Sequence, residues 1–197
     1  MEVAEVGGFG ANYAYLYFAL QEAVEEYQQR KRRTEMSPPV PEETGGDLIR
    51  LYYALDQARA TVILLAAACV EAIANVYLAM KTTPEQFAVL ESAAFIEKWM
   101  VLPTLFLQGY VFPKGSTLAQ DLKLLHDRRN GLLHMKAMVT KGGVVIHKGT
   151  RPTVPGDEDA FIKRCASLPI RLIEHVASFD PAGAVAAIHF TLSAAQR

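Results

Sequence analysis

Several residues suited to chemistry lie close together in the segment Leu125 to Lys136, which reads LHDRRNGLLHMK. In this segment Arg129 and Asn130 precede His134 by five and four positions. A histidine titrates near neutral pH, so it can accept or deliver a proton at a reacting oxygen. A guanidinium presents several donors in one plane, which suit a phosphate whose oxygens gain charge during a reaction. The residue types therefore indicate proton transfer beside a bound phosphate.

The spacing of these residues has a geometric consequence if the segment is helical. Asn130 and His134 then share one face, and His126 lies one turn earlier on the same face. Arg129 points about 140° away from His134 around the helix axis. Three arrangements would bring Arg129 and His134 to one site. The arginine side chain curls round the helix, the helix deforms near Gly131, or a second subunit supplies the complementary group.

A second unusual polar pair consists of Glu71 and Asn75, which lie one helical turn apart in an otherwise apolar stretch. A buried carboxylate needs a partner, and an arginine such as Arg129 would serve. The pair could support catalysis, or it could fix the register of a core helix. Arg128 is a spare cation beside the motif and could add affinity for phosphate.

The elements that must position these residues are predicted to be helices. Residues 47–83 contain neither Gly nor Pro and predict one long central helix. Further helices are predicted at 11–33, at 84–102 as one or two short pieces, at 116–139 with the motif, at 157–180 and at 181–196. A small β-hairpin is expected near 141–150. We therefore predict one all-α domain over 1–197, with a connector at 33–46 and a hairpin or loop insertion at 141–156.

Charge is more informative by segment than over the whole chain. The chain has 197 residues and a net charge of −1, which favours neither nucleic acid nor an acidic ligand. Residues 121–151 contain seven Lys or Arg and two Asp, a local net charge of +5. Such an excess suits phosphate contacts, and it equally suits a solvated helix end and hairpin.

The sequence also predicts where the protein is found. Its first residues carry acids and no long apolar run, so we expect no signal peptide. The apolar stretch 60–80 is interrupted by Glu71, and we expect a buried helix there instead of a membrane span. Cys69 and Cys165 lack metal or redox spacing, which is typical of buried thiols in a reducing compartment. We expect a cytoplasmic protein with no membrane partner.

Several chemistries are excluded by spacing. The chain contains no GxxxxGK[ST], GxGxxG, HExxH or GxSxG motif and no calcium-binding EF-hand loop. No Glu is followed three residues later by His, as a di-iron helical bundle would require. His126, Asp127 and His134 make a poor metal-ligand set. We expect neither a metal nor a cofactor.

The pattern at Arg129, Asn130 and His134, with three residues before the histidine, resembles the signature of the HEPN superfamily of helical ribonucleases and nucleotide-binding proteins. The segment IEKWMVLP, Ile96 to Pro103, also resembles segments of such proteins. The resemblance covers about Leu48 to Lys136 and leaves the first helix and the C-terminal third outside it.

The resemblance implies a homodimer in which the motifs of two chains face one cleft and cleave RNA without metal. His134 would move a proton at the ribose 2′-hydroxyl or the leaving 5′-oxygen, and Arg129 would hold the phosphate. Asn130 would orient the phosphate or the imidazole. The products would carry 2′,3′-cyclic phosphate ends, and DNA would resist cleavage. A toxin or phage-defence effector with an antitoxin or defence partner is the expected biological setting.

One departure and two alternatives accompany this hypothesis. In toxins paired with a nucleotidyltransferase antitoxin a tyrosine stands two residues beyond the histidine, whereas this chain has Lys136, so control through that tyrosine is not expected. The first alternative is a non-catalytic HEPN-like module that binds a nucleotide, RNA or a protein partner in the same cleft. The second is a helical assembly protein whose apolar loop at 102–115 makes the subunit contact and in which the histidine motif is merely structural. Trp99, Tyr110 and Phe112 are expected in the core or at a dimer interface.

Overall fold

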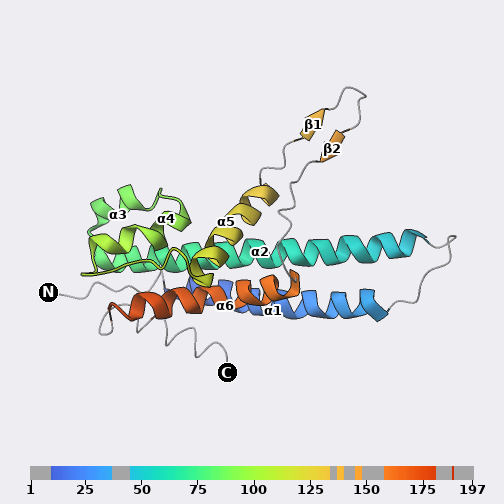
Figure 1. Cartoon of the computed structure of the whole chain (residues 1–197), viewed down its shortest axis with the longest axis horizontal. Helices are drawn as coiled ribbons and strands as arrows, with labels where there is room; N and C mark the ends of the chain where they lie inside the picture. Colours follow the sequence, from blue (N-terminus) through green and yellow to red (C-terminus); the bar gives the residue numbers. More distant parts are fainter. Residues whose placement is uncertain are drawn as a thin grey trace.

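The computed structural model describes residues 10–36, 45–133, 137–139, 145–147, 158–180 and 188, and its fold is all-α as predicted (Figure 1). The helices are α1 (Gly10–Met36), α2 (Gly45–Lys81), α3 (Pro84–Leu90), α4 (Phe95–Met100), the 3₁₀ helix η2 (Leu102–Leu105), α5 (Thr117–Leu133) and α6 (Glu158–Ala177). Two short strands, β1 (Ala137–Val139) and β2 (Val145–His147), lie between α5 and α6 in the chain.

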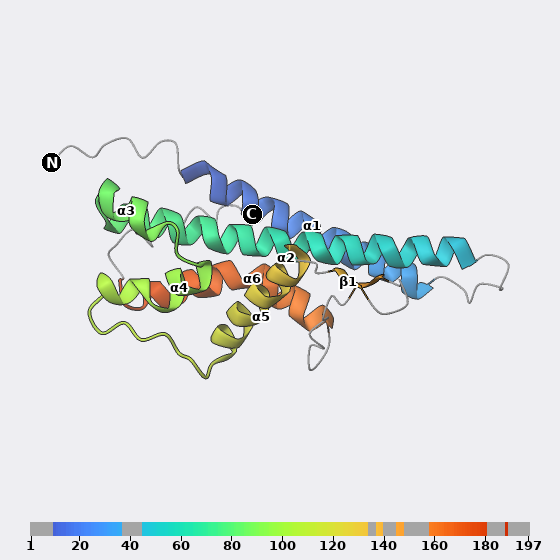
Figure 2. The ribbon, with the colours of Figure 1, turned by 90° about the horizontal axis from the view of Figure 1, so that it is seen from above.

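The long helix α2 is the centre of the molecule. It runs antiparallel to α1, and α5 and α6 pack against it on another side (Figures 1 and 2). Its apolar side chains recur every three or four residues, and Val62, Ala66, Val70 and Ile73 are fully buried. Their spacing turns one continuous apolar stripe toward the neighbouring helices, which is why this stretch folds as a core helix.

The composition of α2 also satisfies the requirements for crossing a membrane. Residues Arg50–Lys81 are long and apolar enough by that test, but 61% of the most apolar window is buried inside the protein. That burial is what a core helix shows, because its apolar side chains are already covered by other helices.

Helix α6 has a clear apolar face that closes the core. Phe161, Cys165, Leu168 and Leu172 are buried and follow the helical repeat. The opposite face carries polar side chains. This strong segregation explains why the helix was predictable from sequence, within one residue of its observed start.

The predicted helix at 116–139 is too long. The helix α5 ends at Leu133, and Ala137–Val139 forms β1 instead. In the antiparallel pair, Ala137 faces His147 and Val139 faces Val145, so ladder hydrogen bonds replace helical ones. The hairpin prediction near 141–150 is thus confirmed for β2, whereas the first strand begins earlier than expected.

Other boundaries differ less. The connector predicted at 33–46 is shorter, because α1 continues to Met36 and α2 begins at Gly45. The two short helices predicted at 84–102 are α3 and α4. Thr83 caps α3 through a reciprocal capping box with Gln86, ahead of Pro84 at the first helical position. Except for Ile188, the predicted helix at 181–196 lies outside the described residues.

The apolar loop at 102–115 packs onto the protein's own core. Leu107, Tyr110 and Phe112 are buried, and the Tyr110 hydroxyl donates a hydrogen bond to the Trp99 carbonyl at 2.7 Å. The Trp99 Nε1–H in turn donates to the Val70 carbonyl at 3.1 Å. The expectation that these aromatic residues lie in a core is therefore confirmed.

Candidate active site on α5

The helix α5 separates an apolar face from the polar residues of the motif. Ser116 caps its start by accepting a hydrogen bond from the Ala119 N–H at 3.2 Å. Leu122 and Leu125 are fully buried and fix the rotation of the helix against the core. That rotation leaves the side chains of His126, Arg129 and Asn130 half-buried at the surface.

These three side chains and Asp127 form a continuous chain of hydrogen bonds, which we call the α5 polar row. Arg129 Nη1 donates to Asn130 Oδ1 at 3.1 Å, and Asn130 Nδ2 lies 3.1 Å from His126 Nε2. His126 Nδ1 lies 3.2 Å from Asp127 Oδ1. Because the amide NH₂ can only donate, a neutral His126 must accept at Nε2 and carry its proton on Nδ1, toward Asp127.

Two of the three arrangements that could bring Arg129 and His134 together concern the described part of α5. Arg129 does curl round the helix, since its guanidinium reaches Asn130 on the predicted stripe. The helix α5 continues through Gly131 to Leu133, so no break in the helix is needed for this contact. His134 itself lies outside the described residues.

The ring of Phe95 fixes His126 from the side. The two ring centroids lie 5.4 Å apart with an angle of 60° between the planes, an edge-to-face contact. Phe95 is buried at the start of α4. The position of α4 therefore determines the position of the His126 ring.

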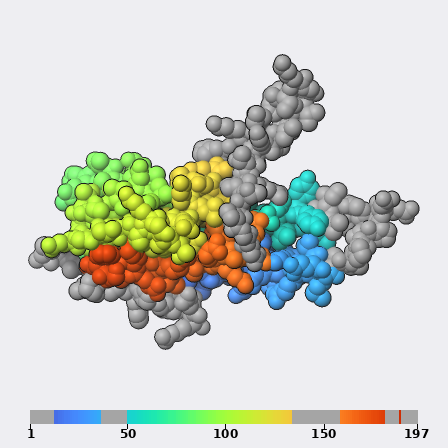
Figure 3. Space-filling model, viewed as in Figure 1, coloured from blue at the N-terminus to red at the C-terminus, as the bar shows by residue number. Residues whose placement is uncertain are grey.

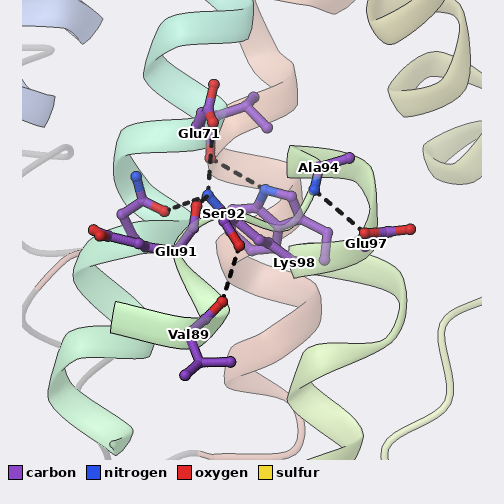
Figure 4. A network of polar contacts seen from close by, with 10 residues as sticks. Glu71, Val89, Glu91, Ser92, Ala94, Glu97 and Lys98 are labelled. Carbon is purple, nitrogen blue, oxygen red and sulfur yellow. Dashed lines mark hydrogen bonds and ion pairs between the residues drawn. The ribbon is translucent and has the colours of Figure 1, made fainter. Parts of the chain in front are cut away.

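A buried lysine holds α4 in place (Figure 4). Lys98 Nζ lies 2.7 Å from Asn75 Oδ1, 2.6 Å from the Glu91 carbonyl and 3.6 Å from Glu71 Oε1. We call this group the Lys98 cluster. It corrects the expectation that Arg129 would pair with Glu71: the partner is Lys98 because α4 lies across α2 at Glu71 and Asn75, whereas Arg129 is turned toward Asn130.

The Lys98 cluster therefore supports the α5 polar row from a distance. Lys98 and Phe95 lie one turn apart on α4, so the bonds to α2 fix the helix whose phenyl ring contacts His126. Glu71 and Asn75 have this positioning role in the described structure. The signal in the sequence was present, since a carboxylate in an apolar helix predicts a cation nearby, but the sequence does not say which cation.

Arg128 is not the spare cation that the sequence suggested. Its side chain is only 11% exposed and points into the seam between α5 and α6, with Nη1 3.9 Å from Glu158 Oε1. Its guanidinium also lies 5.8 Å from the centre of the Phe161 ring. Residue 128 is one position from Arg129 and so faces a different side of the helix, which makes Arg128 a link between helices.

Lys98 and Phe95 of α4 were not expected from the sequence as part of this site, nor was a further group between α5 and α6. That group joins Asp121 of α5 to Arg164 and Arg171 of α6. The charges are far apart in the sequence, and only the packing of the two helices brings them together.

The two cysteines do not add reactive thiols. Burial raises the pKa of the Cys69 thiol to about 12 and also raises the pKa of Cys165. Both are therefore protonated at neutral pH, and thiols in that state are poor nucleophiles. Their burial agrees with the sequence-based interpretation.

A groove of about 620 Å³ between α1 and α2 is separate from the motif. Glu22, Glu25 and Glu26 line it together with Arg30 and Arg33. Arg30 is already paired with Glu26 at 2.6 Å and donates to the Ala54 carbonyl. The mixture of charges makes this groove a poor match for a polyanion.

No family model, curated protein or solved structure matches the chain. Within the ranges that the structure describes, no three His, Cys, Asp or Glu residues come together as metal ligands. The functional assignment therefore depends on the residues of α5 and their chemistry.

Proposed function

We propose that this protein is a metal-independent endoribonuclease of the HEPN type. Its catalytic residues are Arg129, Asn130 and His134, and it acts on RNA in the cytoplasm as a homodimer. The observation that carries the proposal is the α5 polar row, in which Arg129 contacts Asn130 and Asn130 contacts His126 on the helix that carries the first part of the motif.

The proposed reaction begins at the ribose 2′-hydroxyl. Its oxygen attacks phosphorus, the bond from phosphorus to the 5′-oxygen breaks, and the products are a 2′,3′-cyclic phosphate and a 5′-hydroxyl. His134 takes the proton from the 2′-hydroxyl while water protonates the leaving 5′-oxygen, or it protonates the 5′-oxygen while water takes the proton of the 2′-hydroxyl. Arg129 stabilises the charge that grows on the phosphate oxygens, and Asn130 keeps the guanidinium oriented.

The end of α5 has features that suit a second subunit. Gly131 is exposed, and apart from its chain neighbours and the adjacent helix backbone no atom lies within 4 Å of where a Cβ would be. Leu133, two positions further on, is 51% exposed although it is apolar. A helix end with little bulk and an exposed leucine allows close approach of the same helix from another copy, which would bring two motifs together.

The biological setting follows from the activity. An RNA-cleaving enzyme in the cytoplasm must be restrained, so we propose a toxin or phage-defence effector with an antitoxin or defence partner. That partner would cover the end of α5.

The test compares purified wild-type protein with His134→Ala and Arg129→Ala on total RNA in EDTA. We expect fragments from the wild type alone. Lys123→Ala is a matched control, because Lys123 is an exposed cation of the same helix and lies outside the α5 polar row. Binding of RNA without cleavage by the wild type would instead favour the non-catalytic module, and equal cleavage by all four proteins would remove the assigned residues from the mechanism.

A further inference from the structure

Three charged residues join α5 to α6, and these two helices lie next to each other on the face drawn in Figure 3. Asp121 is only 5% exposed. Its Oδ1 accepts a hydrogen bond from Arg164 Nε at 2.9 Å, and its Oδ2 accepts one from Arg171 Nη1 at 2.8 Å. One carboxylate thus faces two guanidinium groups, and the cluster keeps one excess positive charge.

The two arginines keep donors for another partner. A guanidinium carries five N–H groups, and Asp121 uses one nitrogen of each. The side chain of Arg164 is 39% exposed and that of Arg171 is 27% exposed. Among the described residues, no other side-chain hydrogen bond or ion pair of either guanidinium is found. The unused N–H donors of Arg164 and Arg171 and the excess positive charge of the cluster therefore lie together at the surface.

The arrangement is already organised for an anion. Both guanidinium groups are fixed by the same buried carboxylate, so little side-chain freedom remains to be lost when a ligand binds. Held this close, the two like charges repel each other, and an anion that bridges them reduces this repulsion. A phosphate group offers several acceptor oxygens, which match the paired donors of two arginines.

We infer that Arg164 and Arg171 form a second phosphate-binding site, which takes a backbone phosphate of single-stranded RNA away from the cleavage point. The inference rests on the proposed function. Asp121 lies eight residues before Arg129 on α5, a rise of about 12 Å. Two phosphate contacts, one on α6 beside Asp121 and one at Arg129 of α5, suit an extended strand, because a free phosphate ion can occupy only one of them.

The test measures binding of a fluorescent 12-nucleotide 2′-O-methyl RNA, which cannot be cleaved, by anisotropy over a range of salt concentrations. Removing the arginines alone would leave Asp121 buried without a partner and could unfold the protein. The variant is therefore Asp121→Asn with Arg164→Gln and Arg171→Gln, which keeps polar groups at all three positions. Lys123→Gln is the matched control, because it changes net charge by the same amount and lies on another side of α5.

We expect the triple variant to bind about tenfold more weakly and its salt dependence to lose about 0.7 in slope, the value for one phosphate contact on a single strand. Lys123→Gln should stay within about twofold of wild type. Equal affinity and slope in the triple variant and Lys123→Gln would overturn the inference. So would inorganic pyrophosphate binding as tightly as the 12-mer, since that would assign the site to a free anion.

The outcome is independent of the cleavage assay. If no RNA is cleaved but the triple variant binds the 12-mer more weakly than Lys123→Gln does, the proposed catalysis fails and the phosphate site stands. If His134→Ala abolishes cleavage but the triple variant binds like the control, the catalysis stands and the second site is wrong. A urea melt of each variant verifies that the protein binding the probe is folded.

Discussion

The Lys98 cluster and the α5 polar row are both built from one cation and neighbouring oxygen or nitrogen acceptors, but their burial differs. Lys98 is 2% exposed, and its ammonium group is surrounded by three oxygens from α2 and from the turn before α4. In the α5 polar row, the side chain of His126 is 27% exposed and that of Asp127 is 51% exposed. The cation of the Lys98 cluster is closed to solvent, although Glu71 at its edge is 37% exposed, whereas the α5 polar row is open along its length.

The difference separates a structural role from a chemical one. A buried cation held by two hydrogen bonds and a neighbouring carboxylate stabilises the contact between two helices, and a substrate in solvent does not reach it. Partly exposed groups on a helix surface can reach a ligand, while their hydrogen bonds to one another fix their orientation. The Lys98 cluster therefore positions α4, and the α5 polar row is the place where chemistry is expected.

The largest expected effect is on catalysis. His134→Ala should lower the rate of RNA cleavage by about 10²- to 10⁴-fold, because it removes the general acid or base. The free energy of unfolding should stay within about 0.5 kcal/mol of wild type. Single-turnover cleavage and urea denaturation measure the two quantities. A loss of stability that matches the loss of rate would place His134 in the fold instead of the reaction.

The next largest effect is expected in the Lys98 cluster. Lys98→Met should lower the free energy of unfolding by about 2 kcal/mol, since it leaves the Glu91 carbonyl and Asn75 Oδ1 without a donor. Urea denaturation measures it, and Lys123→Met on the exposed side of α5 is the control. If both variants have the same stability, the Lys98 cluster does not hold α4.

A smaller effect is expected inside the α5 polar row. Asn130→Ala removes the link between Arg129 and His126, and we expect about a tenfold fall in cleavage rate, equivalent to about 1.4 kcal/mol. Asn130→Asp keeps the acceptor for Arg129 and should restore part of the rate. An unchanged rate in Asn130→Ala would show that this residue does not orient the arginine.

The smallest effect comes from His175, a partly buried histidine that is surrounded by aromatic rings. His175 lies among the rings of Tyr110, Phe112 and Phe179, and burial lowers its pKa below the usual value near 6.5, despite a hydrogen bond to the Val111 carbonyl. Protonation then favours the unfolded chain, so the stability contributed by neutral His175 is present above pH 6.5 and is lost as the pH falls through the folded pKa.

The variant His175→Phe tests this direction of the pH dependence of stability. Between pH 7.5 and pH 5 its free energy of unfolding should fall by less than that of the wild type, although the variant also loses the bond to Val111. Urea melts at the two pH values give the comparison. An identical pH dependence in both proteins would contradict the structural role of this histidine.

The helices were predictable because their signals are local. The absence of Gly and Pro between Asp47 and Thr83 and the apolar repeat of Asp157 to Asp180 depend on neighbouring residues alone, and α2 and α6 follow them closely. The end of α5 was placed too late because the pairing of Ala137 with His147 competes with the helix across ten positions of sequence. Local helix propensity does not include that competition.

The candidate site was predictable in part. The spacing of His126 and Asn130 placed them on one face, and the contact between them follows from helix geometry. The expected partner of Glu71 and the expectation that Arg128 is a spare cation were wrong, because both depend on which helix packs alongside. The cluster of Asp121 with Arg164 and Arg171 gave no signal, since its members lie on two helices separated by the hairpin.

The central claim is that RNA is cleaved through its own 2′-hydroxyl with His134 moving the proton. The most direct measurement uses a short DNA strand with a single ribonucleotide, incubated in EDTA with wild type or His134→Ala, and mass spectrometry of the fragments. We expect cleavage after that ribonucleotide by the wild type alone, with a 5′ fragment one water lighter than the linear phosphate. A linear phosphate as the first product, cleavage at deoxyribose positions, or equal cleavage by His134→Ala would contradict it.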